Sequence, residues 1–389
     1  MSDIRLSNER KTTAEDLEEI LYAYPDSSDI FLQTGQPIRV MLSKRIIPLT
    51  DRPLQEAEVR ALLTIIGDND SGLYDNALSS GDPKDSSYVS KTGERFRVAM
   101  VRDASRRGMN LSVVMRRIES DPWPLERLRL PPGLLEMTRS RRPGLILVNG
   151  PTGSGKTSLL SGLLNDIVCH RDSHAHLYTV ESPVEYVFYK SASISAAITQ
   201  AEVGKSCSNF ASGVRNAMRM RPTHILIGEI RDPETARAAI AAARTGHTVF
   251  ATMHTSSVPE IFQRWTDFFP DNQRMAMAEL SGSILYAVYQ TLERMPDGRL
   301  MPIQEYLDFD YCGERGDLVE QVAQNPSSTH KLIGRLVKEH GCTHKDDWEN
   351  QIQSSNKKKN ETLLQAVGLT TEETKKPSTA KECRALDYL

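Results

Sequence analysis

The spacing of hydrophobic residues changes character about a third of the way along the chain. Before residue 119, apolar positions recur every three or four residues in some segments and alternate with polar positions in others. This pattern predicts a small α+β unit. Helices are expected at 12–24, where Thr12 and Glu15 have capping-box spacing, and at 56–67; strands are expected within 28–49, 91–103 and 109–118.

A proline-rich segment separates this unit from the rest of the chain. Residues 119–137 contain four prolines, which interrupt regular helices and strands, so the segment is expected to be an interdomain linker. Beyond it, short and continuously apolar segments alternate with helical patterns, as in a largely parallel sheet covered on both faces. The strands of that sheet are expected at 144–150, 176–180, 224–230 and 248–254.

These changes in pattern divide the chain into four parts. We expect an amino-terminal α+β domain at 1–118, the linker at 119–137, and an α/β domain with carboxyl-terminal helices at 138–345. Residues 346–389 are polar and rich in Lys, Glu and Thr, which is typical of a flexible or loosely docked tail.

The overall composition excludes several classes of protein. The chain carries 48 basic and 51 acidic side chains, a net charge of −3, which argues against a protein whose main task is to coat nucleic acid but leaves room for a local basic groove. No apolar run approaches the ~20 residues of a membrane span, so any membrane contact is expected to be peripheral. The five cysteines lie far apart and form no CxxC pair, which indicates a reducing, cytoplasmic compartment rather than a disulfide framework.

The most specific chemical signal is a phosphate-binding loop. The segment GPTGSGKT fits the pattern G-x-x-x-x-G-K-[ST] and lies between a predicted strand and a predicted helix. Lys156 is expected to reach the β- and γ-phosphates, and the Thr157 hydroxyl to bind Mg²⁺. The sequence therefore predicts ATP and Mg²⁺ as cofactors. The expected cofactor-binding residues are Gly150, Pro151, Thr152, Gly153, Ser154, Gly155, Lys156, Thr157 and Ser158.

Two other predicted strands end in carboxylates. The apolar segment HILIG is followed by Glu229, and the strand at 176–180 runs into Glu181 and Glu185. Ligands of open α/β sheets bind at the carboxyl ends of the strands, so these groups are expected beside the phosphate loop. Glu229 is the candidate that polarises the attacking water, and with Thr157 it is a candidate metal ligand. Each pattern on its own also fits a strand end with a solvated carboxylate.

The segment TGHTVFATMHTSS contains His247 and His254, which could be metal ligands, a proton shuttle or ordinary polar residues. The two histidines are seven positions apart, so on a regular strand they point to opposite faces. No cysteine or HxxxH spacing nearby offers further ligands. Metal binding by these histidines is therefore not expected.

Together, the phosphate loop, ESPVE and RMRPTHILIGEIRDPETARAAIAAARTGHTVFATMHTSS resemble the secretion ATPase superfamily, which drives type II and type IV secretion and type IV pili. The segments correspond to that family's Walker A, Asp box, Walker B and His box, and the resemblance covers about 28–290. It is greatest for the type IVB secretion and conjugal transfer branch. The resemblance implies a PAS-like α+β domain followed by a RecA-like α/β ATPase domain. It also implies catalytic roles for Glu229, Glu181 and His254. His254 is expected either to lie near the γ-phosphate or to help couple the nucleotide state to neighbouring elements, with His247 nearby.

The resemblance further implies a hexamer whose active sites are shared between domains or subunits. In ring ATPases the γ-phosphate charge is commonly met by arginines from another domain or subunit. Arg116 matches the arginine of the family's FRTI segment, and Arg102 and Arg97 are further candidates. The implied partners are other copies of the chain and the inner-membrane or cytoplasmic components of a secretion complex. Direct binding of nucleic acid is not expected, given the even charge and an aromatic content of 6%.

Three departures from the family pattern bear on the function. Ser182 stands where the family usually has Asp, RMRPTHI replaces the acidic segment of pilus ATPases, and the AIRNLIRE segment of pilus retraction is absent. The sequence therefore predicts a hexameric, Mg²⁺-dependent ATPase that powers substrate transfer in type IV or type IVB secretion or conjugation. The alternatives are a pilus assembly or retraction motor, and a nucleotide-gated assembly adaptor with little hydrolysis.

Overall fold

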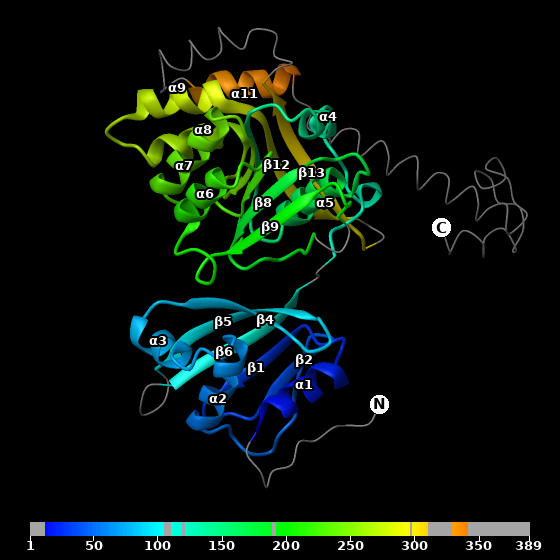
Figure 1. Cartoon of the computed structure of the whole chain (residues 1–389), viewed down its shortest axis with the longest axis vertical. Helices are drawn as coiled ribbons and strands as arrows, with labels where there is room; N and C mark the ends of the chain where they lie inside the picture. The colour runs from blue at the N-terminus through cyan, green and yellow to red at the C-terminus, as the bar shows by residue number, and fades with distance from the viewer. Residues whose placement is uncertain are drawn as a thin grey trace, which may run out of the picture.

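The computed structural model describes residues 12–104, 110–118, 121–188, 192–295, 298–309 and 329–340. These residues form two β-sheets, each covered by helices (Figure 1). The proline-rich residues 121–133, here called the connecting segment, lead to the helices and strands of the second sheet. The tail expected at 346–389 lies outside the described residues. None of the helices in the described part of the chain is long and apolar enough to cross a membrane.

The amino-terminal sheet is antiparallel throughout. Its order is β3-β2-β1-β6-β5-β4, so β4 and β3 are the edge strands. The strands are β1 (Asp29–Gln33), β2 (Arg39–Leu42), β3 (Arg45–Pro48), β4 (Lys84–Val89), β5 (Arg95–Asp103) and β6 (Asn110–Ile118). The helices that pack with them are α1 (Ala14–Ala23), α2 (Glu56–Ile66) and α3 (Leu73–Ser80). Residues 28–49 hold three of these strands, and β4 and α3 were not predicted.

The first helix begins one residue later than its capping-box spacing suggested. Thr13 caps α1 and exchanges hydrogen bonds with Asp16, whereas the pair expected in this role was Thr12 and Glu15. The reason is that Thr12 is buried and its N–H donates to Glu58 Oε1 at 2.6 Å. Thr12 therefore joins the start of α1 to the start of α2 instead of capping its own helix.

The second sheet has the order β13-β12-β7-β11-β10-β8-β9. Every neighbouring pair is parallel except β12 and β13, which form an antiparallel hairpin. The strands are β7 (Gly144–Asn149), β8 (His176–Glu181), β9 (Ala197–Glu202), β10 (His224–Ile227), β11 (Thr248–Met253), β12 (Ile284–Arg294) and β13 (Leu300–Asp308). The four strands expected from apolar runs are all present, and the mixed α/β fold with a parallel sheet is confirmed.

Helices cover both faces of this sheet (Figure 1). On one face lie α6 (Phe210–Arg219), α7 (Pro233–Arg244), α8 (Val258–Asp267), α9 (Gln273–Ser283) and α11 (Thr329–His340); on the other lie α4 (Leu134–Arg139) and α5 (Lys156–Cys169). The alternation of β7 explains the layering. Leu145 and Leu147 pack in the apolar cluster on the face covered by α6, α7, α8, α9 and α11. Ile146 and Val148 pack in the cluster on the face covered by α4 and α5. A continuously apolar strand is therefore needed at this position.

The proline-rich segment is more ordered than the prolines suggested. A short 3₁₀ turn, η1 (Leu125–Arg127), lies within the range expected to be an irregular linker, and α4 begins there, directly after Gly133. The segment packs on α5, because a methyl group at Gly162 would lie 2.2 Å from Leu128 Cδ1 and 2.8 Å from the Trp123 carbonyl oxygen. Its carboxyl end is held by the Tyr286 hydroxyl, which donates to the Pro132 carbonyl at 2.6 Å.

The two sheets also touch through a small polar cluster, here called the interdomain clasp, formed by Asp68, Ser87, Glu202 and Lys205. The Ser87 hydroxyl lies 2.8 and 3.0 Å from the two carboxylate oxygens of Glu202. Lys205 Nζ donates to the Ser87 carbonyl at 3.0 Å and lies 3.5 Å from Asp68 Oδ2. Because Glu202 is the last residue of β9 and Ser87 lies on β4, the clasp joins one edge strand of each sheet.

The contact between α5 and the connecting segment makes a testable prediction about Gly162. A Gly→Ala change inside an exposed helix ordinarily stabilises a protein by roughly 0.5–1 kcal/mol. Gly162→Ala is instead expected to destabilise the protein by about 1–3 kcal/mol, because the new methyl group would overlap Leu128 and the backbone of Trp123. Denaturant unfolding measures the change.

The matched control is Gly282→Ala in α9, where a Cβ would have no neighbour within 4 Å. This substitution is expected to be neutral or mildly stabilising. If both substitutions stabilised the protein, the tight packing of the connecting segment on α5 would be wrong.

Candidate active site

The strand order brings four chemically important chain segments to one edge of the second sheet. Strands β7, β11, β10 and β8 are consecutive neighbours and parallel, so their carboxyl ends lie side by side. The phosphate loop follows β7, His254 follows β11, Glu229 follows β10, and Glu181 ends β8. This edge is where ligands of open α/β sheets bind.

The phosphate loop is shaped by its close approach to β12. Gly150 has φ +144°, and a Cβ there would lie 2.1 Å from the Gln290 carbonyl oxygen. Gly155 has φ +83°, and a Cβ there would lie 2.9 Å from Gln290 Nε2. Both positions combine a positive φ with a crowded neighbour, so only glycine fits without distortion. Helix α5 then starts at Lys156, with its amino-terminal N–H groups at the end of the loop.

The side chain of Lys156 folds back against the phosphate loop. Its ammonium group donates to the carbonyl oxygens of Gly150 and Pro151, each at 2.8 Å. Burial lowers the pKa of the Lys156 amine, while the charges of Glu229 and Glu185 act in the opposite direction. A partly desolvated ammonium group beside free helix N–H groups is suited to binding phosphate.

Glu229 and His254 form a second group at the same edge. Glu229 Oε1 lies 3.6 Å from His254 Nε2. The His254 Nδ1 atom lies 3.2 Å from the Gly150 carbonyl, and because a carbonyl only accepts, Nδ1 carries the proton in this contact. His254 therefore connects the carboxylate after β10 to the first residue of the phosphate loop.

Glu181 differs from Glu229 in its environment. The Glu181 side chain is buried, and burial raises the pKa of its carboxyl to about 7. Three donors act in the opposite direction, the shortest being the Thr179 hydroxyl at 2.6 Å from Oε1, with the Glu185 N–H and the Gln200 amide each at 3.4 Å. The carboxyl therefore changes charge close to neutral pH.

One cavity of about 640 Å³ lies at this edge, and both sheets contribute residues to its lining. The amino-terminal sheet supplies Asp85 and Arg97, which form an ion pair at 3.1 Å, and the connecting segment supplies Trp123. Of the expected cofactor-binding residues, Gly150 and Pro151 do not line the cavity, but their carbonyl oxygens accept hydrogen bonds from Lys156. The remaining seven line the cavity: Thr152, Gly153, Ser154, Gly155, Lys156, Thr157 and Ser158. Glu181, Glu229 and His254 line it as well.

The structure places the candidate arginines differently from one another. Arg97 reaches the cavity, whereas Arg116 is exposed and its Nε lies 2.8 Å from Asp29 Oδ1, and Arg102 lies exposed on β5. Within one chain, therefore, Arg116 and Arg102 are not brought to the cavity. Their contribution to a neighbouring subunit's site stays a prediction.

Three other residues near the site were not predicted from the sequence. Asp85 and Trp123 line the cavity, and Gln290 supports the phosphate loop, but none was predicted to do so. Asp85 lies on an edge strand of polar composition, which offers no pattern, and Trp123 lies among prolines. Gln290 does carry a signal, because a lone amide in an otherwise apolar strand is unusual and needs a buried partner.

The two histidines of the 247–254 segment lie at opposite ends of β11. His247 precedes the strand, and its Nδ1 lies 2.9 Å from the Ala242 carbonyl at the end of α7. The expectation that His247 lies near His254 is therefore wrong, because a six-residue strand, Thr248–Met253, separates them. Among the described residues, no group of three or more His, Cys, Asp or Glu side chains could hold a metal ion.

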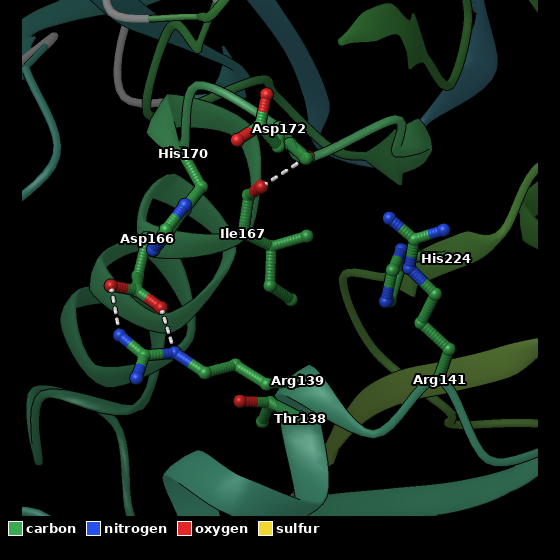
Figure 2. A pocket seen from close by; sticks show the side chains of 9 residues that line it. Thr138, Arg139, Arg141, Asp166, Ile167, His170, Asp172 and His224 are labelled. Atoms are coloured by element: carbon green, nitrogen blue, oxygen red, sulfur yellow. Dashed lines mark hydrogen bonds and ion pairs between the residues drawn. The ribbon is translucent and has the colours of Figure 1, made fainter. Parts of the chain in front are cut away.

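A second cavity of about 200 Å³ lies near the opposite edge of the sheet (Figure 2). There, Asp166 binds Arg139 through two hydrogen bonds of 2.8 Å, which neutralises that guanidinium. His224 is fully buried, and burial together with the charge of Arg141 lowers the pKa of its imidazole to about 4. The side chains therefore supply little net positive charge to this cavity, and it has no phosphate loop. Of these two cavities, the larger one is therefore the candidate nucleotide site.

Comparison with known proteins agrees with this geometry. The family described as "Type II/IV secretion system protein" matches residues 88–376. The chain belongs to this family. The earlier resemblance to the secretion ATPase superfamily is thus confirmed.

Individual members of the family are similar over most of the chain. The uncharacterized protein YggR of Escherichia coli (strain K12) is 36% identical over 267 residues, covering 68% of this chain and 77% of that protein. The type IV pilus retraction ATPase PilT of Pseudomonas aeruginosa is 32% identical over 290 residues, covering 73% and 80%.

Solved structures of the family have the same fold. The Legionella pneumophila ATPase DotB superposes with a TM-score of 0.81 at 30% identity, covering 90% of this chain and 94% of that one. The pilus retraction motor PilT with bound ADP gives a TM-score of 0.67 at 30% identity, covering 87% and 97%. The chain is therefore an ATP hydrolase of the type II/IV secretion family, and its second sheet has the RecA-like fold of these ATPases.

The buried carboxyl of Glu181 predicts a characteristic dependence of stability on pH. Between its ordinary pKa of 4.5 and about 7, the folded protein keeps a proton on Glu181 that the unfolded chain has lost. This group's contribution to stability therefore falls as pH rises through that range. Glu181→Gln removes the effect and is expected to gain about 2–3 kcal/mol relative to the wild type at pH 8, but little at pH 5.

Denaturant unfolding from pH 5 to pH 8, without nucleotide, measures this difference. Glu126→Gln, at an exposed position on η1, is the control and should follow the wild-type curve. If wild-type and Glu181→Gln curves ran parallel across the range, the raised pKa of Glu181 would be refuted.

The close approach of β12 predicts which glycines of the phosphate loop tolerate a methyl group. Gly150→Ala is expected to weaken nucleotide binding at least tenfold, because its Cβ would lie 2.1 Å from a backbone carbonyl that cannot turn away. Gly153→Ala is the matched control: φ is also positive, at +79°, but a Cβ would have no neighbour within 4 Å. Titration with a fluorescent ADP analogue compares the two, and equal losses would show that β12 does not shape the loop.

Proposed function

We propose that this ATPase powers the transfer of substrates through a type IV secretion or conjugation system, most specifically of the type IVB branch. The observation that carries the proposal is the likeness to the ATPase DotB, whose TM-score of 0.81 over 90% of the chain exceeds the 0.67 found for the retraction motor PilT. The absence of the pilus-retraction segment AIRNLIRE supports the same assignment.

The working form is proposed to be a homo-hexamer with active sites completed at subunit contacts. Two features support this arrangement. Within one chain, the only cation that the amino-terminal sheet brings to the described cavity lining is Arg97, which is already paired with Asp85. Arg116 and Arg102 are exposed on the same sheet, where a neighbouring subunit could receive them. Exposed arginines that serve a neighbour's γ-phosphate are a recurrent device of ring ATPases.

The roles of the site residues follow from their positions. The loop N–H groups and Lys156 bind the phosphates, and Glu229 accepts a hydrogen bond from the attacking water. His254, which contacts both Glu229 and the Gly150 carbonyl, keeps Glu229 at a fixed position relative to the loop. Glu181 ends β8, the strand next to β10, and gain or loss of its proton changes the charge of the cavity wall. Thr157 Oγ1 and the Glu229 carboxylate are the groups proposed to hold Mg²⁺.

The donor set fits Mg²⁺. A hydroxyl and a carboxylate that line the same cavity offer the oxygen ligands that this ion prefers. Within the described part of the chain, no group of three or more His, Cys, Asp or Glu side chains could hold a metal ion on its own. That arrangement suits an ion whose other ligands are phosphate oxygens and water. When bound, Mg²⁺ would neutralise part of the phosphate charge.

Movement of the amino-terminal sheet is proposed to transmit the hydrolysis cycle to the secretion complex. The nucleotide cavity is built from both sheets, so a change at the phosphates alters how they sit together. The proposed docking site of the hexamer is a set of inner-membrane or cytoplasmic secretion components, with the ATPase itself peripheral to the membrane. Direct contact with nucleic acid forms no part of this proposal.

A pilus motor is the second candidate. PilT and the type IV pilus ATPase PilU of Pseudomonas aeruginosa are each 32% identical to this chain over about 70% of its length. The adaptor alternative is disfavoured, because Lys156, Thr157, Glu229 and His254 converge on one cavity. A binding module has no need of a carboxylate placed to polarise water.

The decisive experiment compares steady-state ATP hydrolysis by the wild type and by Glu229→Gln over a range of protein concentrations. Wild-type turnover is expected to rise cooperatively with concentration as rings form. Glu229→Gln is expected to lose at least 100-fold in kcat, because the carboxylate that orients water is removed, while ADP binding without Mg²⁺ stays close to that of the wild type, because the loop N–H groups and Lys156 are kept.

Glu234→Gln is the control, since Glu234 is exposed on α7 and pairs with Arg215 at 2.9 Å. It should retain full turnover. Turnover that is independent of concentration would refute the hexameric site. Stimulation by single-stranded DNA would instead indicate a motor that acts on DNA directly.

A further inference from the structure

Two glutamines lie opposite each other in the interior of the β12–β13 hairpin. Gln290 on β12 is the register partner of Gln304 on β13, and their side chains are 3% and 1% exposed. Burying a side-chain amide is unfavourable unless its donors and acceptors are paired. Two such amides side by side therefore need partners of their own, and these partners lie in functionally important segments.

The two amides form a directional chain of hydrogen bonds. Gln304 Nε2 donates to the Arg129 carbonyl of the connecting segment at 2.8 Å and to Gln290 Oε1 at 2.8 Å. Gln290 Nε2 in turn donates to the Ser154 carbonyl of the phosphate loop at 2.7 Å. Both terminal acceptors are backbone carbonyls, so rotating the Gln290 amide by half a turn would set oxygen against oxygen at Ser154.

The β12–β13 hairpin makes two further contacts with the phosphate loop and the connecting segment. The Gln290 carbonyl touches Gly150 at the start of the phosphate loop, and the Tyr286 hydroxyl donates to Pro132 in the connecting segment. Neither glutamine lines the nucleotide cavity. Gln290 and Gln304 therefore act on nucleotide only through the backbone that they hold.

We propose that Gln290 and Gln304 are positioning residues that couple the conformation of the connecting segment to that of the phosphate loop. Displacement of Arg129, as the segment moves with the amino-terminal sheet, withdraws one acceptor from Gln304. The Gln290 amide then loses its fixed orientation, and the Ser154 carbonyl is released. A released loop binds phosphates less tightly, because its N–H groups are no longer held in the binding geometry. The inference rests on the proposed use of this loop for nucleotide.

The test begins with Gln304→Leu in the full-length protein. Leucine has a similar volume but no donor, so both of the Gln304 hydrogen bonds are lost. The dissociation constant for a fluorescent ADP analogue is expected to rise about 5–10-fold, and KM for ATP with it, the size expected when one or two buried hydrogen bonds are removed. Gln263→Leu is the control, since the Gln263 side chain is exposed on α8, where its Nε2 donates to Asp267 Oδ1 at 3.0 Å.

A double-mutant cycle separates positioning from a purely structural role. Gln290→Leu and Gln304→Leu each leave part of the other buried amide unpaired, whereas the double variant removes both amides, so that only the Ser154 and Arg129 carbonyls lose their donors. If the pair positions the loop, the double variant regains part of the lost thermal stability but still binds ADP as weakly as Gln290→Leu. If the pair only stabilises the fold, ADP affinity recovers along with stability.

The outcomes distinguish this inference from the function on which it rests. Unchanged ADP affinity in both single variants, with turnover still abolished in Glu229→Gln, would overturn the coupling and leave the ATPase site intact. Wild-type protein that failed to bind ADP would overturn the use of the loop itself.

Discussion

Strands β7, β11, β10 and β8 pair in parallel, and this pairing determines where the functional side chains can lie. These strands are buried on both faces, so their residues are apolar, and only their ends are free to carry chemistry. Parallel pairing puts those ends at a single edge, where the phosphate loop, His254, Glu229 and Glu181 meet. Helices on one face and α5 on the other keep the strands in register, and so fix the spacing of the site.

The sequence predicted the parts of the structure that local patterns determine. Four buried strands were recognised because their apolar runs are continuous, and the phosphate loop because its glycine spacing is specific. Strands β12 and β13 were missed because glutamines interrupt their apolar pattern, and the reason for those glutamines lies in backbone carbonyls far along the chain. The short α4 was missed because neighbouring prolines obscured it.

Site residues that depend on tertiary placement were harder to predict. Arg97 and Arg116 lie opposite each other on neighbouring strands, yet the former reaches the cavity and the latter pairs with Asp29. No local pattern separates two arginines of this kind. The protonation of Glu181 is a similar case: its sequence suggested a solvated strand end, but burial beneath 182–188 and beside β9 raises the pKa of its carboxyl to about 7.

The interdomain clasp has a mechanical consequence. Among the described residues, the amino-terminal core draws only on 17–115, and the two clusters around the second sheet begin at Leu134, so no apolar cluster is shared. What joins β4 to β9 is polar: a serine, two carboxylates and a lysine, whose hydrogen bonds water can replace. The two sheets can therefore separate without exposing either core to solvent. The distance to which the sheets can separate is then limited by the connecting segment, which the second sheet holds at Arg129 and Pro132. It is not limited by attraction between the two surfaces.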